Sequence, residues 1–292
     1  MATHHELTLP NGVQLHYIQS RRANPSAPTL LLLHGFPASA NQFRTLIPLL
    51  APHANILAPD LPGFGFTKTP SGYTHSFANL ANTVGLFLDA LEVKSFIAYI
   101  FDYGSPTFFR LALQRPEAVK GIISQNGNAY VEGFGQEFWA PLQDWWAAGN
   151  ELAPIREVIR TEVLSFATTR SQYVDNVPKE LVPKVDPAGY TLDYLQNVAS
   201  PEQQEVQLQL FWDYRTNVDQ YPAWQEWLRK SRVPVLAVWG RNDQIFVKAG
   251  AEAYKKDVKD LEVVLLDGGH FVLETHVEEV AEKIKAFLTK FQ

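Results

Sequence analysis

Short apolar runs alternate with amphipathic segments along most of the chain. The apolar runs, each followed by a turn-forming sequence, cover residues 29–33, 54–58, 96–101, 119–124, 233–239 and 261–266. Continuous apolar runs of this length are typical of strands buried on both faces of a parallel sheet. Segments with helical spacing of apolar residues cover 41–50, 77–91, 107–114, 248–256 and 277–291. This alternation predicts an α/β protein with a mostly parallel, twisted sheet flanked by helices.

The N-terminal segment has a different pattern. Residues 6–9 and 13–18 alternate apolar and polar side chains around Asn11-Gly12. Asn-Gly between two alternating runs is the strongest short signal for a β-hairpin, so we expect antiparallel strands at this end of the sheet.

The alternation of strands and helices is interrupted in the middle of the chain. Residues 129–228 are rich in Trp, Tyr, Gln and Pro, and they contain helical patches but no good strand. We therefore expect a core made of residues 1–128 and 229–292, with a helical cap, 129–228, inserted in it. The insertion follows a predicted strand, which places the cap over the carboxyl ends of the strands, where open α/β sheets bind ligands.

Composition narrows the range of functions. The 292 residues are 46% hydrophobic and 19% charged, with a net charge of −6 and no basic run, so no nucleic-acid partner is expected. The absence of cysteine excludes disulfides, thiol catalysis and zinc–thiolate sites. No signal-peptide pattern and no apolar stretch of roughly 18 residues is present, so we expect a soluble, cytoplasmic protein with no membrane partner.

One strand–turn–helix segment carries the strongest chemical signal. The apolar run 96–101 stops at Asp102-Tyr103-Gly104, and the helical segment 107–114 follows. This layout places a carboxylate at the apex of a sharp turn. A carboxylate is ionised at neutral pH and can displace a leaving group from an sp³ carbon. The segment therefore favours opening an epoxide or removing a halide over cleaving an ester or a peptide.

Two other polar residues, like Asp102, follow predicted strands, and the three occur along the chain in the order nucleophile, acid, histidine. Asp243 comes after the strand 233–239, and His270 comes after the strand 261–266. Taken singly, Asp102 could be a turn residue, Asp243 a helix cap and His270 a loop histidine. Their common position at the carboxyl ends of parallel strands favours a triad of nucleophile, acid and base.

The acid of such a triad could also follow the strand 119–124. That loop offers Asn126 and Asn128 but no carboxylate. This absence favours Asp243 as the residue that orients His270.

A site of this kind needs two backbone N–H groups to hold a developing oxyanion. The N–H of Tyr103 is one candidate, because this residue directly follows the apex. The loop HGFP, residues 34–37, follows the predicted strand 29–33, and the N–H of its Phe36 is the second candidate. Pro37 fixes the turn and has no N–H of its own.

The combination of HGFP, DLPGFG, an aspartate at the apex, Asp243 and GGHF resembles the α/β-hydrolase superfamily, in its epoxide hydrolase and dehalogenase branch. The resemblance covers about two thirds of the chain. It implies two cap tyrosines that hydrogen-bond an epoxide oxygen. Tyr214 resembles the second of these, and the candidates for the first are Tyr190, Tyr194, Tyr173 and Tyr130.

Departures from the family patterns help to choose the branch. The resemblance implies that haloalkane dehalogenases have a Trp after the nucleophile and an Asn or a second Trp elsewhere as halide donors, whereas this chain has Tyr103 and Phe36. Cap tryptophans such as Trp139, Trp145 or Trp146 could assist a halide. Fluoroacetate dehalogenases carry arginines after the nucleophile and a cap histidine, and both are missing here. Epoxide hydrolysis is the favoured activity, with dehalogenation and non-catalytic small-molecule binding as alternatives.

The aromatic content, 12% with seven Trp, indicates a small apolar or aromatic substrate that reacts with water. Candidate substrate-binding residues are Tyr190, Tyr194, Trp139 and Phe271. The proposed chemistry requires no cofactor and no metal.

Overall fold

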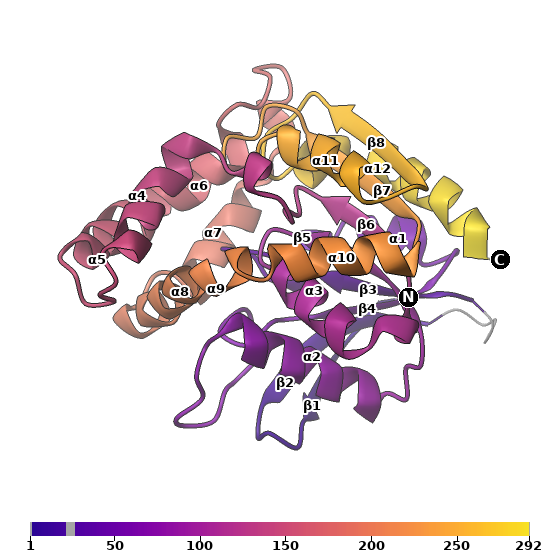
Figure 1. The fold of residues 1–292 in the computed structure, drawn as a ribbon, viewed down its shortest axis with the longest axis horizontal. Helices are drawn as coiled ribbons and strands as arrows, with labels where there is room; N and C mark the ends of the chain where they lie inside the picture. Colours follow the sequence, from indigo (N-terminus) through magenta and orange to yellow (C-terminus); the bar gives the residue numbers. More distant parts are fainter. Residues whose placement is uncertain (1, 22–26, 292) are drawn as a thin grey trace.

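The computed structural model describes residues 2–21 and 27–291 and contains one eight-stranded sheet (Figure 1). The strand order is β1-β2-β4-β3-β5-β6-β7-β8, and all neighbours from β4 to β8 are parallel. The strands are β1 (Thr3–Thr8), β2 (Gln14–Ser20), β3 (Thr29–Leu33), β4 (Asn55–Pro59), β5 (Phe96–Phe101), β6 (Val119–Gln125), β7 (Val235–Gly240) and β8 (Leu261–Leu266). The predicted α/β architecture is confirmed.

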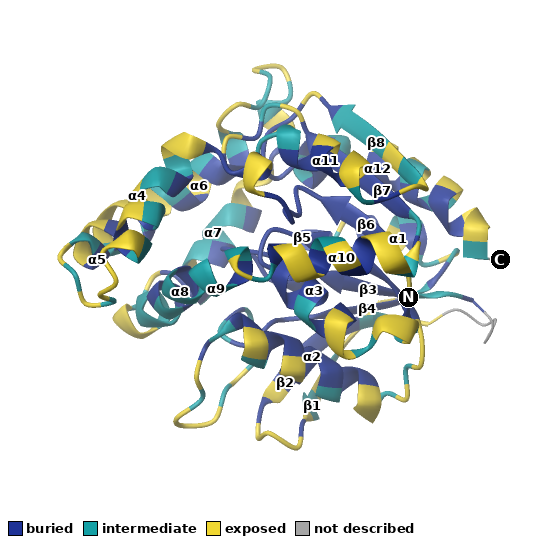
Figure 2. Ribbon diagram, viewed as in Figure 1, coloured by how far each residue is buried: buried dark blue, intermediate teal, exposed yellow. Residues whose placement is uncertain are grey.

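Apolar side chains on both faces explain why the central strands have no polar alternation. In β5, Ala98 and Ile100 belong to one hydrophobic core, whereas Ile97, Tyr99 and Phe101 belong to the other. Successive side chains of a strand point to opposite faces, so a strand covered on both sides must be apolar throughout. Figure 2 shows the central strands as almost uniformly buried, with exposed positions concentrated on the outer surfaces of the helices.

The predicted N-terminal hairpin is present. Strand β1 pairs antiparallel with β2, and β2 in turn pairs antiparallel with β4. The chain reverses between them, where the Leu9 N–H donates to the Val13 carbonyl and Gly12 has a φ of +81°. Only a glycine adopts such a φ without strain.

The helices lie in two layers around the sheet and in the cap. They are α1 (Leu46–Leu50), α2 (Phe77–Ala90), α3 (Gly104–Gln114), α4 (Gln136–Ala147), α5 (Ile155–Val158), α6 (Phe166–Val174), α7 (Pro187–Asn197), α8 (Pro201–Asp213), α9 (Arg215–Val218), α10 (Tyr221–Ser231), α11 (Ala249–Ala253) and α12 (Leu273–Leu288). Helices α1 and α12 contribute to one core, and α2, α3 and α10 contribute to the other.

Several helices differ from the segments that periodicity predicts. Segment 41–50 forms a 3₁₀ turn, Ala40–Phe43, followed by α1, and segment 248–256 likewise divides into α11 and a 3₁₀ turn, Tyr254–Lys256. Helix α12 starts four residues before the predicted 277 and bends at His276. Periodicity detects the face that a segment buries, but it does not detect such changes in winding.

Helices α4 to α9 form a lobe on one side of the sheet, and both termini lie on the opposite side (Figure 1). Helix α10 runs beside α3, where the Trp224 ring stacks on Phe109 with 5.1 Å between centroids. The division of the chain into a core and a cap at 129 and 228 stays a prediction. In the described part of the chain, no helix is long and apolar enough to cross a membrane.

Candidate active site

Asp102 occupies the sharp turn between β5 and α3. Its φ is +46°, in the left-handed region, and its carbonyl accepts a hydrogen bond from the Ser105 N–H at 3.0 Å. Gly104 makes the turn possible, because a Cβ at this position would lie 2.3 Å from the Leu33 carbonyl oxygen. Strained backbone of this kind is typical of functional sites.

Ile100 stands two residues before Asp102, where many sequences of this type have a glycine. The neighbouring loop accommodates the larger side chain, because Gly127 lies beside it. A Cβ on Gly127 would come within 3.1 Å of the Ile100 Cγ1 atom. The space that a glycine at position 100 would leave is therefore provided by Gly127, in the loop after β6.

The two predicted oxyanion donors meet on one oxygen of the nucleophile. The Phe36 and Tyr103 N–H groups both donate to Asp102 Oδ1, each with an N···O distance of 2.6 Å. Gly35 permits this approach, since a Cβ there would lie 2.3 Å from the Asp102 Cβ. With Oδ1 held by two donors, Oδ2 is the oxygen left to attack a substrate.

A cap residue that the sequence analysis missed supports the loop carrying Phe36. The buried Asn197 side chain, at the end of α7, donates through Nδ2 to the Pro37 carbonyl at 2.6 Å and to the Ala38 carbonyl at 3.3 Å. Its Oδ1 accepts from the Gly65 N–H at 2.8 Å. One amide therefore joins the cap to two loops of the core.

His270 and Asp243 form the hydrogen-bonded pair that their positions predict. His270 Nδ1 lies 2.8 Å from Asp243 Oδ2, and His270 Nε2 lies 4.0 Å from Asp102 Oδ2 with no hydrogen-bond partner. Asp243 also accepts from the Asn126 amide at 2.6 Å and from the Ile245 N–H at 2.7 Å. Asn126, in the loop without a carboxylate, thus holds the acid instead of replacing it.

Burial and charge together set the protonation of the triad. Burial raises the pKa of Asp102 to about 6, although the His270 charge and the two backbone N–H groups act in the opposite direction. Burial by itself would lower the pKa of His270, but the Asp243 and Asp102 carboxylates outweigh it and raise this pKa. At neutral pH Asp102 is therefore mainly ionised, but it lies close to its titration range.

If Asp102 is the nucleophile, kcat/KM should fall about tenfold for each pH unit below about 6, because a carboxyl group attacks carbon only in its ionised form. Steady-state kinetics between pH 4.5 and 8 measure this dependence. A kcat/KM that stays constant down to pH 4.5 would contradict a nucleophile with a raised pKa.

Tyr214 lies between α8 and α9. Its ring belongs to a cluster of buried aromatic side chains, the aromatic wall, made of Phe77, Tyr103, Trp139, Phe211 and Tyr214. This wall lies beside the sharp turn at Asp102, called the elbow below. The Tyr214 ring centroid lies 5.9 Å from that of Tyr103 and 4.6 Å from that of Trp139. Its hydroxyl makes no well-aligned hydrogen bond, although the Tyr221 side chain lies close enough for a weak hydrogen-bond interaction that adds to the effect of burial on the pKa of Tyr214. Burial raises the pKa of Tyr214 well above its usual value, so the side chain is a neutral O–H donor.

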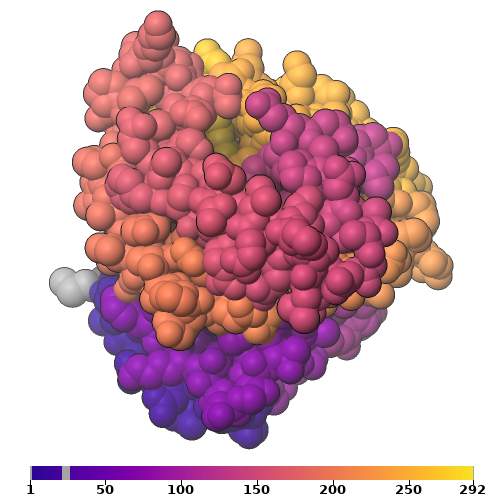
Figure 3. Space-filling model, turned by 90° about the vertical axis from the view of Figure 1, so that its left-hand side faces the viewer, coloured from indigo at the N-terminus to yellow at the C-terminus, as the bar shows by residue number. Residues whose placement is uncertain are grey.

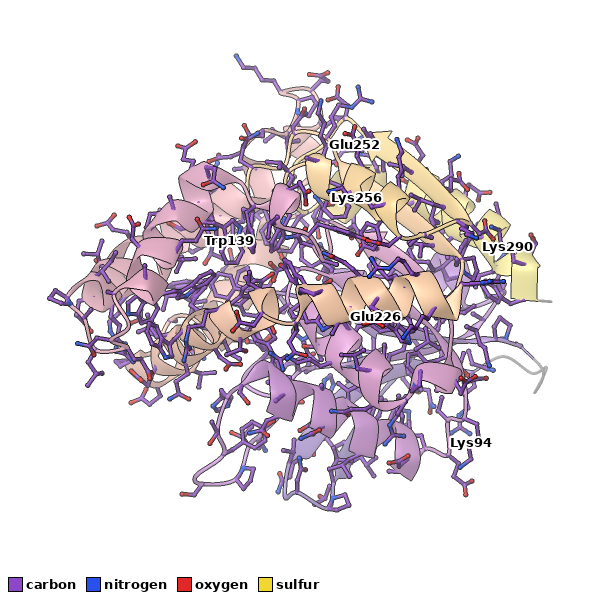
Figure 4. The ribbon with its side chains drawn as sticks, viewed as in Figure 1. Lys94, Trp139, Glu226, Glu252, Lys256 and Lys290 are labelled. Atoms are coloured by element: carbon purple, nitrogen blue, oxygen red, sulfur yellow. The ribbon has the colours of Figure 1, made fainter. Side chains whose placement is uncertain are left out.

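The candidate cap tryptophans have no free N–H for a ligand. Trp139, on the side of the cap that faces the sheet (Figure 4), donates to the Ile245 carbonyl at 2.9 Å. Trp145 donates to the Glu151 carbonyl at 3.1 Å and Trp146 to the Phe211 carbonyl at 2.9 Å. Trp139 can therefore contribute its ring surface to the aromatic wall, but its indole proton is occupied.

The other candidates lie near one another but farther from the elbow. The rings of Tyr190 and Tyr194 contact Phe166, at 6.0 and 5.4 Å between centroids. Phe271 packs behind His270, and its other face stacks on Tyr173 at 3.7 Å. No ring contact or hydrogen bond among the described residues joins Tyr190 or Tyr194 to Asp102 or His270. Substrate binding by these two tyrosines and by Phe271 stays a prediction.

A buried acid on α7 was also missed by sequence analysis. The Tyr173 hydroxyl donates to one oxygen of Asp193, and the other oxygen, Oδ1, has no partner. Burial raises the pKa of Asp193 to about 8, although the hydrogen bond from Tyr173 opposes this shift; Glu274 raises it further. Asp193 is therefore mainly protonated at neutral pH.

Asp193→Asn is expected to remove a pH-dependent loss of stability. The pKa of this carboxyl is higher in the folded than in the unfolded protein, so its contribution is complete below about pH 4 and is lost as the pH rises toward about 8. Over that range the wild-type free energy of unfolding should decrease by about 1.4 kcal/mol per pH unit relative to the variant. Urea unfolding of both proteins at several pH values measures this difference. Parallel curves would contradict a protonated Asp193.

The surface is hollowed where the cap meets the C-terminal part of the core. Figure 3 shows a hollow between the magenta part of the cap, around α4, and the salmon part, around α6 and α7; yellow C-terminal atoms are visible at its floor. The triad itself is buried, with Asp102, Asp243 and His270 at most 4% exposed. Across residues 2–21 and 27–291, no group of three or more His, Asp or Glu side chains is arranged to hold a metal ion.

Comparison with known proteins agrees with this architecture. The family model described as the alpha/beta hydrolase fold matches residues 28–277. An uncharacterized hydrolase of Saccharomyces cerevisiae is 49% identical over 284 residues, which cover 97% of this chain and 96% of that protein. A haloalkane dehalogenase of Mesorhizobium japonicum is 32% identical over 142 residues, which cover 47% of this chain and 42% of that protein.

Solved structures show the same fold. The haloalkane dehalogenase DbeA from Bradyrhizobium elkani superposes with a TM-score of 0.77 at 21% identity, covering 100% of this chain and 99% of that chain. The epoxide hydrolase CorEH superposes with a TM-score of 0.78 at 20% identity, covering 100% of both chains. Identities this low establish the fold and leave the choice of substrate to the chemistry of the site.

Proposed function

The chain belongs to the α/β-hydrolase family, and we propose that this hydrolase opens an epoxide to a diol through an alkyl ester on Asp102. The observation that carries the proposal is an aspartate at the elbow with one oxygen held by the Phe36 and Tyr103 N–H groups. This arrangement matches attack on carbon by Oδ2, followed by hydrolysis at a carbonyl whose oxygen already lies between two donors.

In the first step, Asp102 Oδ2 forms a bond to one ring carbon, and the bond from that carbon to the epoxide oxygen breaks. The oxygen keeps the electron pair and takes a proton from the neutral Tyr214 hydroxyl. The product is a hydroxyalkyl ester of Asp102. Because its hydroxyl is buried without a well-aligned hydrogen-bond partner, Tyr214 can donate to the oxygen without first breaking a well-aligned hydrogen bond.

In the second step, His270 Nε2 takes a proton from water as the water oxygen attacks the Asp102 carbonyl carbon. Charge develops on Oδ1, which the two N–H groups stabilise. The intermediate then expels the alkoxide, which takes the proton from His270, and the remaining carboxyl proton returns to the tyrosinate of Tyr214. Ester formation removes the Asp102 charge that helps to raise the pKa of His270, so this pKa falls and more of the histidine is in the neutral form that can accept a proton from water.

Two features support an epoxide over a halide as the leaving group. The N–H groups of the candidate cap tryptophans donate to backbone carbonyls, so none of the three is free to bind a halide. The free donor in the aromatic wall is instead a hydroxyl, which can supply the proton that an epoxide oxygen requires but a halide does not.

Intact-protein mass spectrometry of the His270→Gln variant tests the proposal. The variant is exposed separately to styrene oxide, 1,2-epoxyhexane and 1-bromobutane, with Asp102→Asn as the matched control. We expect an adduct with the mass of a whole epoxide, and none on the control.

Other outcomes separate the alternatives. An adduct with the mass of a butyl group without bromine, and none from the epoxides, would identify a dehalogenase. The absence of any adduct would contradict the ester mechanism and favour a hydrolase-fold protein that binds small molecules without turnover.

A further inference from the structure

The described tyrosines differ sharply in what their hydroxyl groups do. Most of those that are buried have a hydrogen-bond partner within the protein: Tyr99 with Gln125, Tyr130 with Asp257, Tyr173 with Asp193, Tyr221 with Asn128 and Tyr254 with Gly127. The partly buried Tyr73 is likewise paired, with Thr83. Among the described tyrosines, only Tyr103 and Tyr214 combine a fully buried hydroxyl with no well-aligned hydrogen-bond partner.

These two tyrosines are also neighbours. Their ring centroids lie 5.9 Å apart, and both rings contact Phe211 or Phe77 in the same aromatic wall. The Tyr103 ring lies 5.9 Å from Phe36, the residue whose N–H holds the nucleophile. Both side chains therefore lie where the cap meets the elbow.

A buried hydroxyl without a partner is destabilising by roughly 1–3 kcal/mol. Native proteins contain few such groups, and one beside a reactive carboxylate calls for an explanation. Two such hydroxyl groups in the aromatic wall are explained if both donate to the same polar atom of the reacting substrate. The charge of Asp102 contributes to the raised pKa of both tyrosines, and of no other tyrosine for which a shift is resolved.

We propose that the Tyr103 hydroxyl is the second donor to the epoxide oxygen and works together with Tyr214. The pair would then combine one tyrosine from the elbow with one from the cap. Tyr103 stabilises the developing charge through its O–H group, while Tyr214 transfers the proton, so the proton balance of the first step is unchanged. This inference rests on the proposed epoxide chemistry and adds a catalytic residue to it.

The candidates for a cap partner of Tyr214 fit this role less well. Tyr130 and Tyr173 donate to carboxyl groups, and their hydroxyls are therefore occupied. Tyr190 and Tyr194 are partly exposed and pack against Phe166. Tyr103 has the additional property that its own N–H already contacts the nucleophile.

The test compares five single substitutions: Tyr103→Phe and Tyr214→Phe for the proposed pair, Tyr190→Phe and Tyr194→Phe for the alternative partners, and Tyr73→Phe as the control. Each is made in the His270→Gln background and in the protein with His270 intact. The rate of ester formation with styrene oxide is followed by intact mass in the first background. Ester hydrolysis is measured by rapid-quench kinetics in the second. Removing a single donor to developing charge typically slows a step about 10²-fold.

We expect Tyr103→Phe and Tyr214→Phe each to slow ester formation about 10²-fold, with little change in ester hydrolysis. Tyr73→Phe, which loses only a hydroxyl paired with Thr83, should form the ester at the parent rate. If Tyr190→Phe or Tyr194→Phe slows ester formation in place of Tyr103→Phe, that tyrosine is the second donor. If the Tyr103 hydroxyl had only a structural role, its removal would not slow ester formation selectively. Thermal unfolding should also show that Tyr103→Phe is at least as stable as its parent.

Two results would overturn the inference and are distinguishable. If Tyr103→Phe forms the ester at the parent rate while Tyr214→Phe is slow, Tyr103 is not a donor, but the epoxide hydrolase proposal stands. If the His270→Gln parent forms no ester with any epoxide, the proposed function fails, and the role of Tyr103 fails with it.

Discussion

Asp102→Asn is expected to abolish product formation and, at the same time, to stabilise the folded protein. An amide is not a nucleophile toward an epoxide carbon, so no ester should form. The raised pKa of Asp102 means that the fold opposes its ionisation. Stability from this group is complete below about pH 4 and is lost as the pH rises toward about 6. At neutral pH the variant should therefore gain about 3 kcal/mol.

Product assays and urea unfolding at pH 7.5 measure the two effects. Asparagine tolerates a positive φ, so the substitution adds little strain at the elbow. At pH 4 the two proteins should have nearly equal stability, which serves as an internal control. A variant that is inactive and also less stable at pH 7.5 would show that Asp102 is held in an environment that favours its charge, contrary to the raised pKa.

His270→Gln is expected to divide the reaction into a fast first step and a stalled second step. In the proposed mechanism the histidine is the base for water, and general-base catalysis typically contributes about 10²–10⁴-fold. Steady-state turnover should fall by that factor, while a burst of about one equivalent of ester per protein still forms. Rapid-quench kinetics with the epoxide that labels the protein provides the measurement.

A matched variant checks that the effect belongs to the imidazole. Asn126→Ala removes one of the hydrogen bonds that hold Asp243 but leaves His270 in place. It should slow the second step less than His270→Gln does. If His270→Gln slows ester formation and ester hydrolysis equally and shows no burst, the assignment of His270 to ester hydrolysis is contradicted.

The geometry of the candidate site could be predicted from the sequence because each of its three side chains comes shortly after a strand. Asp102, Asp243 and His270 each follow a recognisable apolar run, and a parallel sheet gathers such ends at one edge. The geometry of the Phe36 and Tyr103 N–H groups likewise agrees with the prediction, because backbone donors depend on the turn more than on side-chain type.

The residues that the sequence analysis missed depend on long-range contacts without a local motif. On α7, Gly189, Asp193 and Asn197 recur every fourth residue and therefore share one face. On a partly exposed helix, that pattern cannot be distinguished from an ordinary solvated face. The tertiary fold determines what these residues contact: the Tyr173 hydroxyl on α6 for Asp193, and core loops for Asn197.

Some strands and helices begin or wind differently from the predicted segments, and the reasons lie in the backbone. Strand β7 begins at Val235, two residues after the apolar run starts, and Pro234 before it has no N–H to donate to a neighbouring strand. In the cap, the turn Ile159–Val163 winds as a π-helix, which hydrophobic spacing cannot distinguish from an α-helix.

Asn197 has a consequence for exchanging caps among related hydrolases. Its single amide spans from the cap to the Pro37 and Ala38 carbonyls and to the Gly65 N–H. A foreign cap grafted onto this core could carry a well-shaped binding cavity and still leave the loop with Phe36 unsupported. Chimeric enzymes would then lose rate in ester hydrolysis even when they bind substrate well. Retaining an asparagine at this helix end is therefore a design condition for transplanting specificity into this scaffold.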